Sequence, residues 1–421
     1  MPGRLRGAQG PEPGRLVRMG ETRADAGRTG DPGAPVITGR EPGSFARGVL
    51  AERHPALIKQ VREAFPYGPR QQEALDALLH EIIHGVVEPL TRASPDRELW
   101  LAGGREHFGR PWFDAPFLWS ESYFYRRLLG AVGYFDEGAW QGVDPFAPFK
   151  RAELRGATVE QELRALDDLA GVPARERATA LLLASLWGNR ADLGFRGPEG
   201  GTVPGEADPR LVADDSAALW SLLAPGARAT VAVIADNTGR ELIPDLVLAD
   251  HLLEHGHAER IVLYVKPTPY YVSDAMTADV VDCLRRLCEA PGEAGRIGGR
   301  IWEGMGAGRF EVRTHAFFCA PFPYERMPDD LRSELAAATL TILKGDLNYR
   351  RLVGDRLWPA TTAFDALTAY FPGSVAALRT LKSDVAVGLG PGTLERLEGS
   401  GRAWRTSGTH ALIQVRTGRP A

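Results

Sequence analysis

The amino-acid sequence predicts an α/β protein with an all-α N-terminal domain and a three-layer α/β/α C-terminal domain built on a mostly parallel sheet. Between residues 45 and 223, apolar residues recur at three- and four-residue spacing, which is typical of amphipathic helices. After that, short β-rich runs alternate with helical segments, a pattern that favours βα units around a parallel sheet. With 421 residues, the chain is long enough for more than one domain.

The first 44 residues predict a disordered tail. They are rich in Gly, Pro and Arg and hold almost no periodic apolar residues, so they lack the apolar surface that folding requires. We therefore expect a tail over residues 1–44, a helical domain over residues 45–223 and an α/β/α domain over residues 224–421.

The individual elements follow from the same periodicities. In the helical domain we expect helices over residues 74–90, 121–132, 159–169 and 175–187, and no strand. In the second domain we expect strands over residues 230–235, 261–265, 310–314, 340–343 and 411–415. Helices are expected between them, over residues 242–255 and 278–289.

Composition excludes several classes of protein. The 50 Lys and Arg residues against 54 Asp and Glu give a net charge of −4, so bulk positive charge for nucleic-acid binding is absent. No apolar run has the length of a membrane span, and three cysteines are too few for a disulfide framework. We expect a cytoplasmic protein with no nucleic-acid or membrane partner and no indicated protein partner.

Polar residues directly follow three of the expected strands. Asp236 and Asn237 follow the first, Asp274 comes shortly after the second, and Lys344 follows the fourth. Parallel strands present their carboxyl ends on one rim, where ligands bind. Two carboxylates and a carboxamide suit Mg²⁺ or Mn²⁺, and a neighbouring lysine suits phosphate. The alternative is that these residues only form turns and helix caps.

A second cationic motif lies nearer the C-terminus. Arg379 and Lys382 are three residues apart, a spacing that on one helical turn brings both cations to the same anion. Together with the strand-end residues, this predicts metal-assisted phosphoryl chemistry.

Several multi-residue motifs resemble, in order and spacing, the damage-control phosphatase family. In the second domain they are Asp-Asn-Thr-Gly-Arg-Glu at 236–241, Tyr-Val-Ser-Asp at 271–274, Lys-Gly-Asp-Leu-Asn-Tyr-Arg at 344–350 and Arg-Thr-Leu-Lys at 379–382. In the helical domain they are Pro-Trp-Phe at 111–113, Glu-Ser-Tyr-Phe-Tyr-Arg-Arg at 121–127 and Leu-Trp-Gly-Asn-Arg-Ala-Asp-Leu at 186–193. More narrowly, the chain is similar to the Arg-Thr-x-Lys subfamily, whose members have also been described as protein-glutamate methyltransferases.

The resemblance implies a divalent-metal phosphatase acting on small phosphorylated metabolites, with sugar phosphates such as fructose 1-phosphate among its substrates. Asp236, Asn237 and Asp274 match the family's metal ligands, and the ion would be Mn²⁺, Mg²⁺, Co²⁺ or Ni²⁺. Lys344 matches the lysine that contacts the phosphoryl group, so Asp236 and Lys344 are the expected catalytic residues. Arg379 and Lys382 fill the subfamily motif and are expected to bind substrate. Transfer of the phosphoryl group to Asp236 and direct attack by water both remain open.

Six further residues on family motifs are expected to bind or position the substrate. They are Glu121, Arg126, Asn189, Asp192, Asp346 and Asn348. Ordinary hydrogen bonding between the two domains is the alternative for all six.

Three other functions are alternatives to a phosphatase. The string His80-Glu81-Ile82-Ile83-His84 has the spacing of a zinc hydrolase, but it falls toward the polar side of its helix and lacks an evident third ligand. A carboxyl methyltransferase using S-adenosylmethionine is a second alternative, although no Gly-rich loop follows the first strand. A metabolite-binding protein without turnover is the third, and the intact set of charged motif residues speaks against it.

Overall fold

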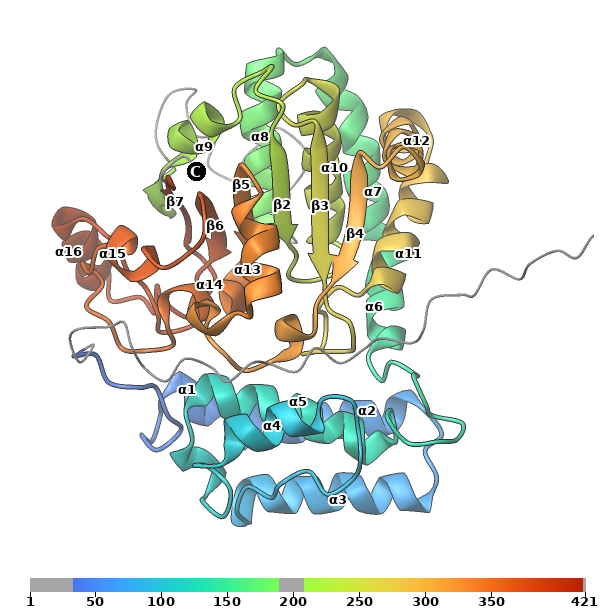
Figure 1. Cartoon of the computed structure of the whole chain (residues 1–421), viewed down its shortest axis with the longest axis vertical. Helices are drawn as coiled ribbons and strands as arrows, with labels where there is room; N and C mark the ends of the chain where they lie inside the picture. The colour runs from blue at the N-terminus through green and yellow to red at the C-terminus, as the bar shows by residue number, and fades with distance from the viewer. Residues whose placement is uncertain (1–32, 189–207, 419–421) are drawn as a thin grey trace, which may run out of the picture.

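The computed structural model describes residues 33–188 and 208–418. As predicted, a helical N-terminal region precedes an α/β region with a mostly parallel sheet (Figure 1). The N-terminal helices are α1 (Phe45–Gly48), α2 (His54–Ala64), α3 (Pro69–His84), α4 (Arg97–Gly104), α5 (Phe117–Val132), α6 (Ala147–Leu154), α7 (Ala157–Ala165) and α8 (Ala174–Trp187). Among the residues described, no helix is both long and apolar enough to cross a membrane.

The sheet has seven strands in the order β1-β7-β6-β5-β2-β3-β4. Their bounds are β1 Leu211–Asp214, β2 Thr230–Ile234, β3 Arg260–Val265, β4 Phe310–Thr314, β5 Leu340–Lys344, β6 Val375–Thr380 and β7 Ala411–Arg416. The five strands from β6 to β4 are parallel to one another, β7 is antiparallel to β6, and β1 is parallel to β7.

Two strands differ from the sequence prediction. β1 lies in a segment where no strand was expected, and β6 was not predicted at all. All six residues of β6 are buried, as are all five of β5, but β6 has two alanines and an arginine where β5 has Thr and Ile, which favour strands. β6 also carries Arg379 and Thr380, which rules out the helical turn expected for that motif.

Helices cover both faces of the sheet. One face packs in a single core with α7, α8, α10 (Leu242–Glu254), α11 (Thr277–Cys288) and α12 (Gly292–Gly306). The other face packs with α13 (Asp329–Ala336), α14 (Gly345–Val353), α15 (Phe364–Thr368) and α16 (Pro391–Gly399). Helices α7 and α8, which the sequence assigned to the helical domain, therefore pack with the sheet.

Helices α2 to α5 form a separate core rich in aromatic side chains. In Figure 1 the layer of α1 to α5 lies below the sheet, on the side toward which the arrows of β2, β3 and β4 point. The carboxyl ends of the parallel strands thus face the helical layer.

Part of the expected tail is ordered against both regions. Residues 33–44 are described, and Ile37 is buried. The Phe117 N–H donates to the Ile37 carbonyl at 2.8 Å, and the Leu357 N–H donates to the Pro35 carbonyl at 2.9 Å. The segment therefore connects the start of α5 with the chain that follows α14.

Candidate active site

The three expected metal ligands meet at the ends of β2 and β3. Asn237 and Asp274 form an isolated antiparallel bridge, and the Ala275 N–H donates to the Asp236 carbonyl at 2.9 Å. The Asn237 carboxamide donates to Asp236 Oδ2 at 3.3 Å and accepts from the Ser273 hydroxyl at 2.7 Å. Two carboxylates and a carboxamide therefore converge from two segments of the chain, in which the bonded residues Asn237 and Ser273 are 36 residues apart.

Gly345, the first residue of α14, makes a close backbone approach to this cluster. Its φ is +83°, a conformation that favours glycine. A β-carbon at this position would lie 1.8 Å from Asp236 Oδ2, which no side chain can tolerate. The Lys-Gly-Asp motif therefore brings the N-terminus of α14 directly against the Asp236 carboxylate.

The electrostatics of the cluster favour a cation. Burial, followed by the nearby carboxylates of Glu241 and Asp274, raises the pKa of Asp236 well above its usual range. The ammonium groups of Lys382 and Lys266 oppose that shift. Carboxylates gathered in a buried place repel one another, and a divalent cation between them removes that repulsion.

Lys266, at the end of β3, was not assigned a role from the sequence. Its side chain is 2% exposed, and its Nζ lies 3.4 Å from Asp274 Oδ2. Neither atom has a hydrogen-bond partner among the residues that the structure describes. Burial raises the pKa of Asp274 to about 6, while Lys266 and Lys150 oppose the shift. The sequence offered one signal for Lys266: it directly follows an apolar strand and precedes a proline. A lysine in such a place is seldom buried unless it is paired with another group.

The donor set fits a hard divalent ion. Asp236 and Asp274 can supply carboxylate oxygens and Asn237 a carboxamide oxygen, and Asp274 Oδ2 is buried without a hydrogen bond from any described residue. Within residues 33–188 and 208–418, no three His, Cys, Asp or Glu side chains form a cluster that could hold a metal. The expected ligands are two aspartates and one asparagine, so they contain only two residues of these four types and do not require such a cluster.

Asp346 organises the loop that follows β6. It accepts from Arg379 Nε at 2.8 Å, from the Ser383 hydroxyl at 3.1 Å and from the Lys382 N–H at 3.3 Å. Burial alone would raise the pKa of Asp346, but the guanidinium groups of Arg379 and Arg350 hold it below the usual value. Asp346 is therefore a carboxylate that fixes the Arg-Thr-Leu-Lys motif in place.

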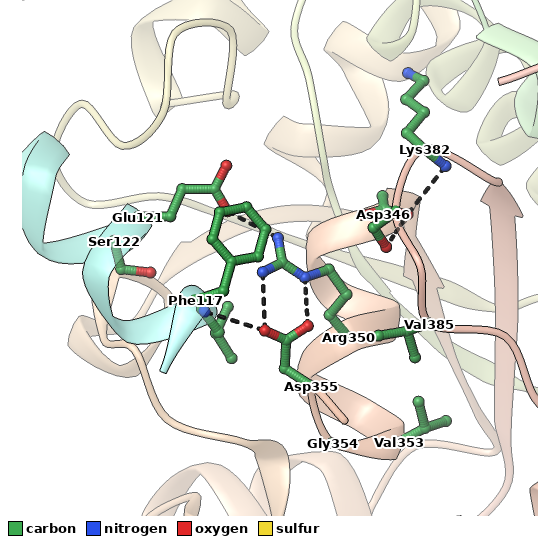
Figure 2. A network of polar contacts seen from close by, with 12 residues as sticks. Phe117, Glu121, Ser122, Asp346, Arg350, Val353, Gly354, Asp355, Lys382 and Val385 are labelled. Carbon is green, nitrogen blue, oxygen red and sulfur yellow. Dashed lines mark hydrogen bonds and ion pairs between the residues drawn. The ribbon is translucent and has the colours of Figure 1, made fainter. Parts of the chain in front are cut away.

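The two cations of that motif lie in different surroundings, and Arg379 lies on a strand, not on the helical turn expected from the sequence. Arg379 is fully buried on β6, and its guanidinium binds Asp346 and Ser383. The Lys382 side chain is 40% exposed, with Nζ 3.5 Å from a carboxylate oxygen of Glu241. Figure 2 shows the Lys382 ammonium pointing away from Asp346, so Lys382 is the accessible cation of the pair.

Lys344 and Asn348 are bonded to the protein itself. Lys344 Nζ lies 2.7 Å from Asp245 Oδ1 of α10 and donates to the Ser185 hydroxyl at 2.9 Å. The buried Asn348 amide donates to the carbonyls of Ala235 at 3.2 Å and Lys344 at 2.8 Å. Asn348 therefore holds the ends of β2 and β5 together.

The helical region contributes less directly than expected. Glu121 of α5 is bonded to Arg350 of α14 (Figure 2) and to Tyr271. Arg126 donates to Asp96 at 2.5 Å and to Ser94 at 2.7 Å, both in the helical region, so its guanidinium is not brought to the strand ends. Asn189 and Asp192 lie outside the described residues.

The His-Glu-x-x-His string at residues 80–84, the alternative zinc motif, makes contacts within the helical region. Glu81, the expected general base, forms an ion pair with Arg127 at 2.6 Å and accepts from the Trp112 indole at 3.3 Å. His80 and His84 are both exposed on α3. This arrangement matches a polar helix face bound to its neighbours.

Comparisons with known proteins agree with the motifs. A family model described as the damage-control phosphatase ARMT1-like domain matches residues 49–397. Proteins named damage-control phosphatase ARMT1 are similar along nearly their whole length. The mouse and human proteins are each 30% identical, covering 90% of this chain and 97% of their own length, and the zebrafish protein is 31% identical, covering 88% and 94%. A solved DUF89 family protein from Pyrococcus horikoshii aligns with 83% of this chain and 93% of its own length, at a TM-score of 0.44 and 14% identity.

Proposed function

This chain belongs to the damage-control phosphatase ARMT1-like family, and we propose that it hydrolyses small phosphorylated metabolites with the help of a bound divalent metal ion. The observation that carries the proposal is the convergence of Asp236, Asn237 and Asp274 at the ends of two neighbouring parallel strands. The substrate class that we propose is sugar phosphates, with fructose 1-phosphate as the first compound to test.

Asp236, Asn237 and Asp274 would hold the ion, which we propose to be Mn²⁺, Mg²⁺, Co²⁺ or Ni²⁺. When bound at such a site, a divalent ion polarises a phosphoryl oxygen and makes the phosphorus easier to attack. The protein supplies rigidity: the Asn237–Asp274 bridge fixes the two ligand segments, and Gly345 packs directly on Asp236. Preorganised groups of this kind need no rearrangement during the reaction.

The phosphate is proposed to bind at Lys382. Its side chain is the more exposed of the two cations in the motif, and Asp346 holds its backbone. Its present partner, Glu241, is 3.5 Å away, so a phosphate can replace or share that contact. Lys344, paired with Asp245, would reach a phosphoryl group only if that ion pair opens, and its contact with substrate stays a prediction.

Phosphate release from metal-stripped protein tests the proposal. We expect release from sugar phosphates only after Mn²⁺, Mg²⁺, Co²⁺ or Ni²⁺ is restored, and none from Asp236→Ala at any ion concentration. Asp329→Ala, which changes an exposed aspartate at the start of α13, is the matched control and should retain full turnover.

Two results would contradict the proposal: turnover by Asp236→Ala at the wild-type rate, or no release by the wild type with any of the four ions. In the second case, binding of S-adenosylmethionine, measured by calorimetry, would separate a methyltransferase from a metabolite-binding protein.

A further inference from the structure

One carboxylate oxygen of the helical layer contacts both segments that build the candidate site. Glu121 Oε2 accepts from Arg350 Nη1 at 2.8 Å and from the Tyr271 hydroxyl at 3.1 Å. Arg350 lies on α14, the helix that begins at the site, and Tyr271 lies three residues before Asp274. Glu121 itself comes from α5, more than 100 residues earlier in the chain.

The contact between Glu121 and Arg350, here called the Arg350 arm, fixes α14 against α5. Arg350 Nε and Nη2 bind the two oxygens of Asp355 at 2.8 and 3.0 Å, as Figure 2 shows. Asp355 Oδ2 also accepts the N–H of Leu118, in the first turn of α5. A paired, two-pronged guanidinium contact is geometrically specific, and it is buried here. Asp346 lies four residues before Arg350, one turn away on the same helix.

The contact between Glu121 and Tyr271, here called the Tyr271 arm, fixes the segment that carries Asp274. Tyr271 has φ of +52°, a left-handed conformation that is unfavourable for a residue with a side chain. Its ring stacks on Tyr125 of α5, with ring centroids 4.5 Å apart. The stack and the hydroxyl bond to Glu121 hold this conformation, and the backbone from Tyr271 to Asp274 follows from it.

We propose that Glu121 is a positioning residue, which sets the distance between the metal-ligand segment and α14, and that it does not recognise substrate hydroxyls. The inference rests on the proposed phosphatase function. It assigns the two arms to different steps. The Tyr271 arm acts on the metal site through Asp274, whereas the Arg350 arm acts on substrate binding through Asp346, which organises the loop of Lys382.

Three conservative variants separate the arms, and a fourth serves as a control. Tyr271→Phe keeps the stack on Tyr125 but removes the bond to Glu121. Asp355→Asn weakens the contact with Arg350, and Glu121→Gln weakens both arms. The control is Tyr270→Phe, which removes the hydroxyl of a neighbouring buried tyrosine that is not bonded to Glu121. For each we would measure Mn²⁺ affinity by titration calorimetry, kcat and KM with fructose 1-phosphate, and Tm.

Tyr271→Phe should weaken Mn²⁺ binding about tenfold, the usual effect of removing a group that orients a metal ligand, with KM unchanged at saturating Mn²⁺. Asp355→Asn should raise KM about tenfold and leave Mn²⁺ affinity unchanged, because a small displacement of a binding group is enough for such a loss. Glu121→Gln should show both effects, and Tyr270→Phe neither. A purely structural role for Glu121 would instead lower Tm in all three without separating metal affinity from KM.

The outcomes distinguish this inference from the proposed function. If the wild type binds Mn²⁺ and releases phosphate while Tyr271→Phe and Glu121→Gln match it, only the positioning role is overturned. If the wild type binds Mn²⁺ but releases no phosphate from any sugar phosphate with any of the four ions, the proposed function fails, and the Mn²⁺ affinity of Tyr271→Phe still decides the metal arm. A wild type that binds none of Mn²⁺, Mg²⁺, Co²⁺ and Ni²⁺ overturns both.

Discussion

The backbone of Gly345 touches the carboxylate of Asp236 so closely that a β-carbon at position 345 would lie 1.8 Å from Asp236 Oδ2. This contact joins the end of β5 to the end of β2 at the atom that is expected to bind metal. It explains why a glycine follows Lys344, since both the close approach and the φ of +83° exclude other residues.

Gly345→Ala should therefore abolish turnover while the rest of the fold persists. The added methyl group must displace Asp236 or α14, so we expect a loss in kcat/KM of at least about 100-fold. Gly299→Ala is the matched control: it lies within α12, its β-carbon would meet nothing within 4 Å, and it should stabilise the protein by about 0.5–1 kcal/mol. Steady-state kinetics and urea unfolding of both variants check this, and normal turnover by Gly345→Ala would contradict the geometry.

Lys266→Met should destabilise the metal-free protein more than the metal-bound one. Removing one member of a buried ion pair costs about 3–5 kcal/mol, because Asp274 is left buried without its cation. A divalent ion at Asp274 replaces that charge, so added Mn²⁺ should raise the Tm of this variant more than that of the wild type. Lys59→Met, at an exposed position of α2, is the control. An equal Tm rise in all three proteins would show that Lys266 does not act on the metal site.

Lys382 and Lys344 should respond differently to substitution. Lys382→Ala should raise KM for phosphorylated substrates about 10- to 100-fold with little change in Tm, because the lost contact is a charge-assisted bond to substrate. Lys344→Met should lower the unfolding free energy by about 3–5 kcal/mol, since Asp245 then stays buried without its partner. Kinetics and thermal melts of the two variants test this contrast. A stable Lys344→Met with raised KM would instead place Lys344 in contact with the phosphoryl group.

His54 should make the protein less stable in mild acid. Burial, aided by the charge of Arg53, lowers the pKa of His54 from 6.5 to about 3, and its ring stacks on Phe124 at 3.7 Å. The folded state keeps this histidine neutral, whereas the unfolded state takes up a proton below pH 6.5. The contribution of His54 to the free energy of unfolding is therefore complete above pH 6.5. It is lost as the pH falls toward 3, by about 1.4 kcal/mol per pH unit.

His54→Phe keeps an aromatic ring on Phe124 but removes this titration. Between pH 7 and pH 5 it should lose about 2 kcal/mol less unfolding free energy than the wild type, measured by urea unfolding at both values. The control His80→Gln, at an exposed position of α3, should follow the wild type. Identical pH dependence of His54→Phe and the wild type would show that His54 ionises in the folded state.

The fold class and the family were predictable because both rest on local patterns. The strands β2, β3, β4, β5 and β7 are short apolar runs bounded by polar residues, and the helices show their spacing directly. The family motifs are contiguous strings, so their resemblance needs no knowledge of how the chain folds. Strand β6 was missed because its sequence, Val-Ala-Ala-Leu-Arg-Thr, contains two alanines and an arginine, whereas the equally buried β5 contains Thr and Ile, which favour strands; that error also misplaced Arg379.

By itself, the sequence determined which residue types follow each strand, and for parallel strands this was enough to expect Asp236, Asn237 and Asp274 at one place. Only the tertiary structure decided what each charged group binds: Lys344 pairs with Asp245, Arg379 with Asp346, and Glu121 with Arg350. These partners lie between 33 and 229 residues apart along the chain. No local pattern encodes such pairs. A buried charge is costly unless an opposite charge lies next to it in space, and that partner can come from any part of the sequence.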